Sequence, residues 1–231
     1  CAITDHDTFS HALYQGLKAA ESQEVSIKKV LPGIEFTVKF IVDGSEKALH
    51  IVAIFSDADE DKVKKIEAIM QNHPLNSDEA YSEEQFLQIL REIDIDTILI
   101  AHQKNTISSN KPRENDATFL GMQKFLEFVY SDYFEAFEFK NKKNEVINKA
   151  YLLQAQLEEQ VRFVTGTDCH DWSVYPKENK SDQLTGDFPY TYVKCLPTFR
   201  GLVMAMTDSS RMRRGNSFFG VDNHTLSEIV I

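Results

Sequence analysis

Residues 97–101 read TILIA and are followed at once by His102, and this stretch decides the fold class that the sequence predicts. A short apolar run with polar residues on both sides is typical of a strand buried inside a parallel sheet. A helical pattern at residues 82–91 precedes the run, and another follows at 118–130 after a polar connection at 103–117. Alternation of this kind predicts βα units around a mostly parallel sheet, which is the α/β class.

The rest of the chain repeats this alternation. We expect strands at residues 1–4, 35–42, 48–55, 134–139, 161–165 and 190–196. We expect helices at residues 8–20, 59–72, 144–159 and 197–206, and a second long polar connection at 171–189. Asp43-Gly44-Ser45 predicts a hairpin turn between the second and third strands. A chain of 231 residues with one such series is expected to form one domain.

Composition narrows the classes of function. Hydrophobic residues make up 42% of the chain, but no stretch is apolar enough to span a bilayer, so no membrane partner is expected. Three scattered cysteines suit a reducing cytoplasm. A net charge of −11 argues against a broad nucleic-acid-binding surface, although it leaves room for one local basic site or for an acidic cluster that binds cations. No GxxxxGK[ST] loop for nucleotide binding is present.

Residue types that bind metals recur where the apolar runs stop. In barrel-like α/β enzymes the carboxyl ends of the strands meet at one mouth, so these side chains are expected to lie together. Imidazoles and carboxylates in combination suit zinc, manganese or iron, and a carboxylate can bridge two ions that together hold a phosphoryl group. The residues at the ends of the runs are His6, Glu35, His102, Asp168 and His170.

Each of these residues alone has an ordinary interpretation. A histidine after a strand is commonly a hydrogen-bonded core or loop residue, and an acidic residue there commonly caps a helix. Asp168 and His170 form a stronger pair, because alternation along a strand sends both side chains to one side. His50 precedes an apolar run instead of ending one, so the strand-end rule gives it no place at the mouth. Trp172 is interpreted as a packing residue or as a platform that stacks on a substrate base.

Five motifs together resemble the PHP (polymerase and histidinol phosphatase) superfamily. They are ITDHD at 3–7, PGIEF at 32–36, LHIVAIF at 49–55, IAH at 100–102 and GTDCH at 166–170. The resemblance implies a distorted (β/α)7 TIM-like barrel over residues 1–207 and a phosphoesterase activity that depends on two or three divalent metal ions, zinc, manganese or iron. It implies catalytic roles for Glu35, Asp168 and His170, with Glu35 as the bridging carboxylate, and a supporting role for Asp5. The metal ligands implied are His6, Glu35, His50, His102, Asp168 and His170.

The family's first motif, a His-x-His on the first strand, is not in this sequence, and we expect it upstream of Cys1. Residues 194–212 (KCLPTFRGLVMAMTDSSRM) are similar to the segment after the PHP domain in TrlF-type proteins, where an SMC-like ATPase domain follows. That similarity implies that residues 208–231 are a tail or linker toward such a domain. Arg211, Arg213 and Arg214 would then be an interdomain contact, or otherwise a solvated basic turn.

The function predicted from the sequence is hydrolysis of a phosphomonoester or phosphodiester, with a nucleotide, another phosphorylated small molecule or a nucleic acid as substrate, by hydroxide bound to the metal cluster. Basic residues of the two long connections would bind the phosphate; they are Lys104, Lys111, Arg113, Lys177 and Lys180. A second hypothesis is a degenerate PHP domain that serves as a structural or regulatory module of a larger ATPase. A third is a carbon–nitrogen hydrolase of the related amidohydrolase group, which usually requires a carboxylated lysine or a first-strand His-x-His.

Overall fold

A computed structural model describes residues 1–24, 27–75, 79–139, 142–167, 169, 173 and 190–215. The strands are β1 (Ala2–His6), β2 (Leu31–Val42), β3 (Ser45–Phe55), β4 (Tyr81–Ser82), β5 (Thr97–His102), β6 (Ala136–Glu138), β7 (Phe163–Val164), β8 (Tyr190–Val193) and β9 (Met212–Gly215). The helices are α1 (His11–Lys18), α2 (Ala20–Gln23), α3 (Glu60–Asn72), α4 (Glu83–Ile93), α5 (Met122–Tyr130), α6 (Lys142–Ala155) and α7 (Phe199–Met206), with 3₁₀ turns η1 (Ala117–Leu120) and η3 (Ser209–Arg211). Within these ranges no helix is long and apolar enough to cross a membrane.

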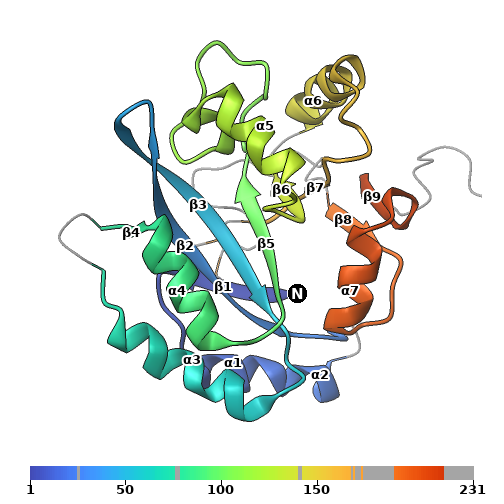
Figure 1. The fold of residues 1–231 in the computed structure, drawn as a ribbon. Coiled ribbons are helices and arrows are strands. Elements are labelled where there is room, and N and C mark those ends of the chain that lie inside the picture. The colour runs from blue at the N-terminus through green and yellow to red at the C-terminus, as the bar shows by residue number, and fades with distance from the viewer. Residues whose placement is uncertain are drawn as a thin grey trace, which may run out of the picture.

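The main sheet is mixed and curled into a half-barrel (Figure 1). Its strand order is β1-β2-β3-β5-β6-β7, and β4 pairs with β2 outside this path. The pairs β1–β2, β5–β6 and β6–β7 are parallel, whereas β3 runs antiparallel to both of its neighbours, β2 and β5. The α/β class is therefore confirmed. The (β/α)7 strand count stays a prediction.

The β2–β3 hairpin forms as predicted and sets the register of the sheet's centre. Asp43 and Gly44 have φ angles of 51° and 74°, the left-handed conformations that a two-residue hairpin turn with native twist requires. The turn places Thr37 of β2 opposite His50 of β3. Because β3 returns antiparallel, its beginning lies at the same end of the sheet as the carboxyl end of β1.

The convex face of the sheet packs against helices α1, α3, α4 and α5. Apolar side chains at alternate positions of the strands point to this face, as the period of two in a strand dictates. Burying these side chains and their helix partners forms the larger of the two cores found among the described residues. Its strand residues include Ile34, Phe36, Val38, Ile51, Ala53, Phe55, Ala101 and Phe137.

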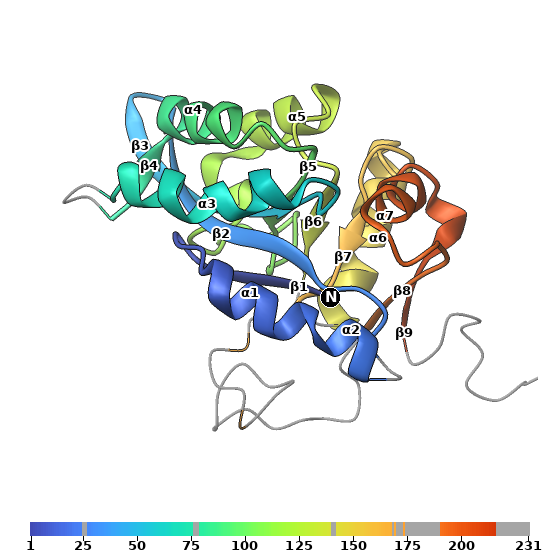
Figure 2. The ribbon, with the colours of Figure 1, turned by 90° about the horizontal axis from the view of Figure 1, so that it is seen from below.

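The concave face of the sheet has two unlike ends. Val52, Ile54, Ile98 and Ile100 form a second apolar core with Phe199 and Met206 of α7 at one end. Figure 2 shows α7 on the other side of the strands from α3 and α4. At the opposite end, the same alternation brings polar side chains to the concave face. One face of the sheet thus changes from apolar to ionisable along the length of its strands.

Two elements differ from their predicted form. Residues 190–196 were expected to add a strand to the main sheet, but β8 pairs antiparallel with β9 in a separate two-stranded sheet. β8 still contacts the main sheet, because the Thr165 backbone N–H donates to the Thr191 hydroxyl at 2.9 Å. The helix expected at 118–130 is broken at Gly121, whose φ of 107° separates η1 from α5. The three arginines predicted to form an interdomain contact or a basic turn lie at the end of the described chain. Arg211 Nε pairs with Asp208 Oδ2 at 3.2 Å, and β9 contains Arg213 and Arg214.

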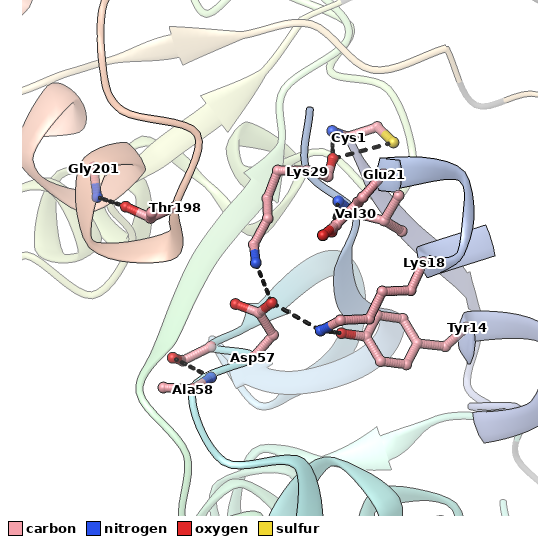
Figure 3. Close-up of polar contacts among 11 residues, drawn as sticks. Cys1, Tyr14, Lys18, Glu21, Lys29, Val30, Asp57, Ala58, Thr198 and Gly201 are labelled. Carbon is pink, nitrogen blue, oxygen red and sulfur yellow. Dashed lines mark hydrogen bonds and ion pairs between the residues drawn. The ribbon is translucent and has the colours of Figure 1, made fainter. Parts of the chain in front are cut away.

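Asp57 ties three segments together at the α7 end of the sheet (Figure 3). Its carboxylate accepts a hydrogen bond from Lys18 of α1 at 2.9 Å and pairs with Lys29, which precedes β2. Lys18 also donates to the Tyr14 hydroxyl at 2.8 Å. Burial acts to raise the pKa of Asp57, but the hydrogen bonds from Lys29 and Lys18 outweigh it and hold this pKa below its ordinary value.

Replacing Asp57 should therefore destabilise the protein in a pH-dependent way. Since its folded-state pKa is lowered, the ionised carboxylate contributes stability above its ordinary pKa of 3.8, and that contribution is lost as pH falls through the folded value. Asp57→Asn should lower the free energy of unfolding by about 2–3 kcal/mol at pH 7, and the deficit should narrow below pH 4. Urea unfolding at a series of pH values measures this, with Asp94→Asn in an exposed pair with Lys62 as a control that should change little. A deficit independent of pH would contradict the assigned role.

Candidate metal centre

In the part of the chain that the structure describes, five histidine and glutamate side chains converge at the polar end of the concave face. His6, His102 and Glu138 are the last residues of β1, β5 and β6, and Glu35 lies in β2 directly beside His6 in the strand register. His50 belongs to β3 and reaches the same end because that strand is antiparallel to its neighbours. The expectation that ligands lie at the carboxyl ends of parallel strands gave His50 no position there, because His50 lies within its strand and does not end it. The hairpin supplies the position that this expectation could not.

The carboxylate of Glu35 is the centre of this group. Its Oε1 atom lies 2.9 Å from His50 Nδ1, 3.7 Å from His6 Nε2 and 3.5 Å from His102 Nε2. His6, Glu35 and His50 each offer a ligand atom within 4.8 Å of the others, as a bound metal ion requires. The rings of His6 and His102 each lie 5.2 Å from that of His50 between centroids. Three imidazoles thus surround one carboxylate oxygen.

The electrostatics of Glu35 favour its ionised form. The residue is buried, with 6% of its surface exposed. Burial acts to raise the pKa of Glu35, but the hydrogen bond with His50 and the charges of His102, His6 and Lys104 outweigh it and hold this pKa below its ordinary value. The protein therefore maintains a buried anion at this point, which a bound cation would neutralise.

His102 gives an independent test of whether this group fits a metal ion. Its side chain is 3% exposed, and among the described residues its Nε2 atom has no hydrogen-bond partner. A buried polar nitrogen without a partner is costly, and such atoms call for a ligand or ion that satisfies them. The orphaned nitrogen beside carboxylate oxygens fits a divalent ion of the zinc, manganese or iron type.

Asp7 anchors the end of β1 to β2. Its backbone N–H donates to the Glu35 carbonyl at 2.8 Å, and its carboxylate accepts from the Thr37 N–H and hydroxyl at 2.8 and 2.9 Å. These bonds hold Asp7 at a φ of 52° and thereby fix the backbone next to His6. From the sequence, the supporting role was expected at the neighbouring Asp5. Asp5 is exposed and borders the nearby cavity.

The polar connection at 103–117 is folded onto the end of β5. The buried Asp116 carboxylate accepts from the backbone N–H groups of Lys104 and Asn105 at 2.9 and 2.8 Å. Gln103 both donates to the Thr118 hydroxyl and accepts from its N–H. This network buries Lys104 and places its Nζ atom 4.0 Å from Glu138 Oε1.

A cavity of about 380 Å³ opens beside the carboxylates. His6, Glu35 and Glu138 form its polar wall, and its apolar wall comes from strands on the concave face, with Val52 and Ile100 among the contributors. The start of the GTDCH motif borders it as well, through Gly166, Thr167 and Cys169. A small ligand in this cavity would lie directly against His6, Glu35 and Glu138.

Of the predicted site residues, the structure brings together His6, Glu35, His50 and His102. Asp168, His170 and Trp172 lie outside the described residues, so their predicted roles stay predictions. Glu138 was missed. It stands in the segment FEAFEF, where a strand was expected, and the available signal was its place as an acidic residue near the end of that strand.

Comparisons with known proteins establish no family. No protein-family model matches the chain, and no curated protein matches it. One similar solved structure is a protein from Bifidobacterium adolescentis, provisionally described as a metal-dependent phosphoesterase. The two share 12% sequence identity over 89% of this chain and 84% of the other, with a TM-score of 0.44. A likeness at this level assigns neither family nor activity to this protein.

Divalent ions should stabilise the protein through this centre. A ligand that binds only the folded state at about 100 times its Kd adds about 2.7 kcal/mol to the free energy of unfolding. Mn²⁺ or Zn²⁺ should therefore raise the melting temperature of the chelator-treated protein, and His50→Ala should remove most of that rise. His11→Ala, in α1, should leave the rise unchanged. An equal rise in wild type and His50→Ala would place the ion elsewhere.

Proposed function

We propose that this protein is a divalent-metal-dependent phosphoesterase of the PHP type. The observation that carries the proposal is the arrangement of His6, His50 and His102 around one oxygen of the buried Glu35 carboxylate. Mixed imidazole and carboxylate donors at the end of a curled α/β sheet form a set that suits hydrolytic metal ions. The orphaned His102 Nε2 atom supports the same interpretation.

The chain's own residues would hold the ions and the substrate. Glu35 stays ionised at neutral pH because its pKa is lowered, so it suits cation binding and not proton donation. Divalent ions bound here would supply Lewis-acid chemistry, polarising the phosphoryl group and lowering the pKa of the attacking water. The hydrogen bonds that Asp7 accepts from Thr37 would keep His6 oriented. The hydrogen bonds that Asp116 accepts would fix the segment after His102.

Lys104 is the best-placed phosphate ligand among the basic residues predicted from the sequence. It is buried beside Glu138 and close enough to Glu35 to affect its pKa, whereas Lys111 and Arg113 are exposed. Lys177 and Lys180 lie outside the described residues. An ammonium group next to a metal centre favours a phosphate monoanion or dianion in the adjacent cavity.

Several finer parts of the proposal come from the sequence resemblance. They are a cluster of two or three zinc, manganese or iron ions, Asp168 and His170 as further ligands and catalytic groups, and a nucleotide or nucleic acid as the phosphoester substrate. With a net charge of −11, contact with a nucleic acid would be local to one phosphate. A cytoplasmic location and a downstream SMC-like ATPase domain complete the expectation.

The test is phosphoesterase activity of the full-length natural chain loaded with Mn²⁺ or Zn²⁺, measured on aryl phosphate mono- and diesters and then on nucleotides and oligonucleotides. His102→Ala should lower kcat/KM at least about 100-fold because it removes a donor from the ion cluster. Lys104→Met should raise KM for the phosphoester and retain bound metal. The matched control is Lys64→Met on the exposed side of α3, which packs on the convex face, and it should keep wild-type kinetics.

Two results would contradict this proposal. A full-length, metal-loaded protein that is inert toward all four substrate classes would contradict the hydrolase assignment. Unchanged behaviour of His102→Ala within the larger protein would then favour the degenerate PHP domain as a structural module.

A further inference from the structure

Glu138 is a buried carboxylate in the metal centre that has no role in the proposed function. It ends β6 on the concave face, is 7% exposed and borders the same cavity as His6 and Glu35. Its two oxygens face different partners. Oε2 lies 3.1 Å from His102 Nε2, and Oε1 lies 4.0 Å from Lys104 Nζ. Glu138 and Glu35 therefore both place a carboxylate oxygen near His102 Nε2.

The contact between Glu138 and His102 is close but is not a hydrogen bond. In the described part of the chain, His102 Nε2 is buried without a hydrogen-bond partner, although carboxylate oxygens of Glu138 and Glu35 lie 3.1 and 3.5 Å away. Two donors that bind one ion at about 2.0–2.2 Å lie roughly 3–3.5 Å apart. The 3.1 Å separation therefore matches two ligands of one ion. Two such ligands both point their lone pairs at the ion, so they would not form a hydrogen bond with each other.

The loop after β7 leaves space for this carboxylate. A Cβ atom added to Gly166 would lie 3.0 Å from Glu138 Oε1 and 3.2 Å from its carboxyl carbon, which is tighter than ordinary packing. Glycine at this position thus lets the Glu138 carboxylate stay inside the cavity wall. Two buried carboxylates, Glu35 and Glu138, near the same imidazole nitrogen also create a concentration of negative charge that a divalent ion would neutralise.

We infer that Glu138 is a further metal-binding residue, which together with His102 holds a divalent ion beside the His6–Glu35–His50 group. The inference rests on the metal centre of the proposed function and adds a ligand that its sequence motifs do not contain. Lys104 Nζ lies 4.0 Å from the other Glu138 oxygen, and Glu138 itself borders the cavity where a phosphate would bind.

The experiment counts ions and measures their affinity, independently of activity. Mn²⁺ is titrated into chelator-treated full-length protein by calorimetry, and bound metal is measured by elemental analysis after dialysis. The variants are Glu138→Gln, which keeps the shape and removes the charge, Glu35→Gln, and Glu127→Gln as a control on the exposed face of α5. Glu138→Gln should lose one ion per chain or bind it at least tenfold more weakly, while Glu127→Gln should match wild type.

The outcomes separate this inference from the proposed function. Glu138→Gln with wild-type stoichiometry and affinity would overturn the role of Glu138, and a weakened Glu35→Gln would in that case leave the proposed function standing. Absence of metal binding by wild type would overturn both. Should Glu138→Gln fail to fold by circular dichroism, Glu138→Asp, which withdraws the charged group by one methylene, must show the same selective weakening. Wild-type binding by Glu138→Asp would then count against the inference.

Discussion

A carboxylate removed from water must be neutralised, and the site of this protein is organised around meeting that requirement at Glu35. His50 reaches it across the hairpin, His6 from the neighbouring parallel strand, and His102 from beyond β3. Every one of these contacts depends on the alternation of side chains along a strand, because a slip of one residue in any pairing would send a donor to the convex face. The hydrogen bonds from Thr37 to Asp7 fix the backbone beside His6, and those from the Lys104 segment to Asp116 fix the backbone beside His102. Both sets of bonds thereby stabilise the strand registers on which the centre depends.

Much of the fold could be predicted because its signals are local. The run TILIA, the Asp43-Gly44 turn and the alternating helical patterns each report their structure within a few residues, and strand, hairpin and helices form close to the expected positions. Glu35 and His102 were found because each follows a short apolar run, although Glu35 lies inside β2 and only His102 ends its strand. The strand at 190–196 was misplaced for the opposite reason. Its partner, β9, follows an intervening helix, and nothing in a short strand's own sequence says which edge it will join.

Other parts of the site lay beyond sequence reasoning because they depend on strand direction and on long-range packing. His50 has a place at the centre only if β3 runs antiparallel, and the tight turn predicted that pairing without indicating its consequence for the site. Glu138 sits among phenylalanines that do form the core, so its own orientation is decided by period-two alternation within a strand of three residues. Asp7 acts through Thr37, thirty residues away, and neither residue signals the other.

The β2–β3 hairpin has a consequence for how the centre assembles. Glu35 and His50 are 15 residues apart and joined by a two-residue turn, so closing the loop between them costs little chain entropy. His6 and His102 come from separate segments and can join only when β1 and β5 dock onto the two sides of the hairpin. Glu35 and His50 thus form a local structure with low contact order, of the kind that forms early in folding, and the remaining ligands are added to it.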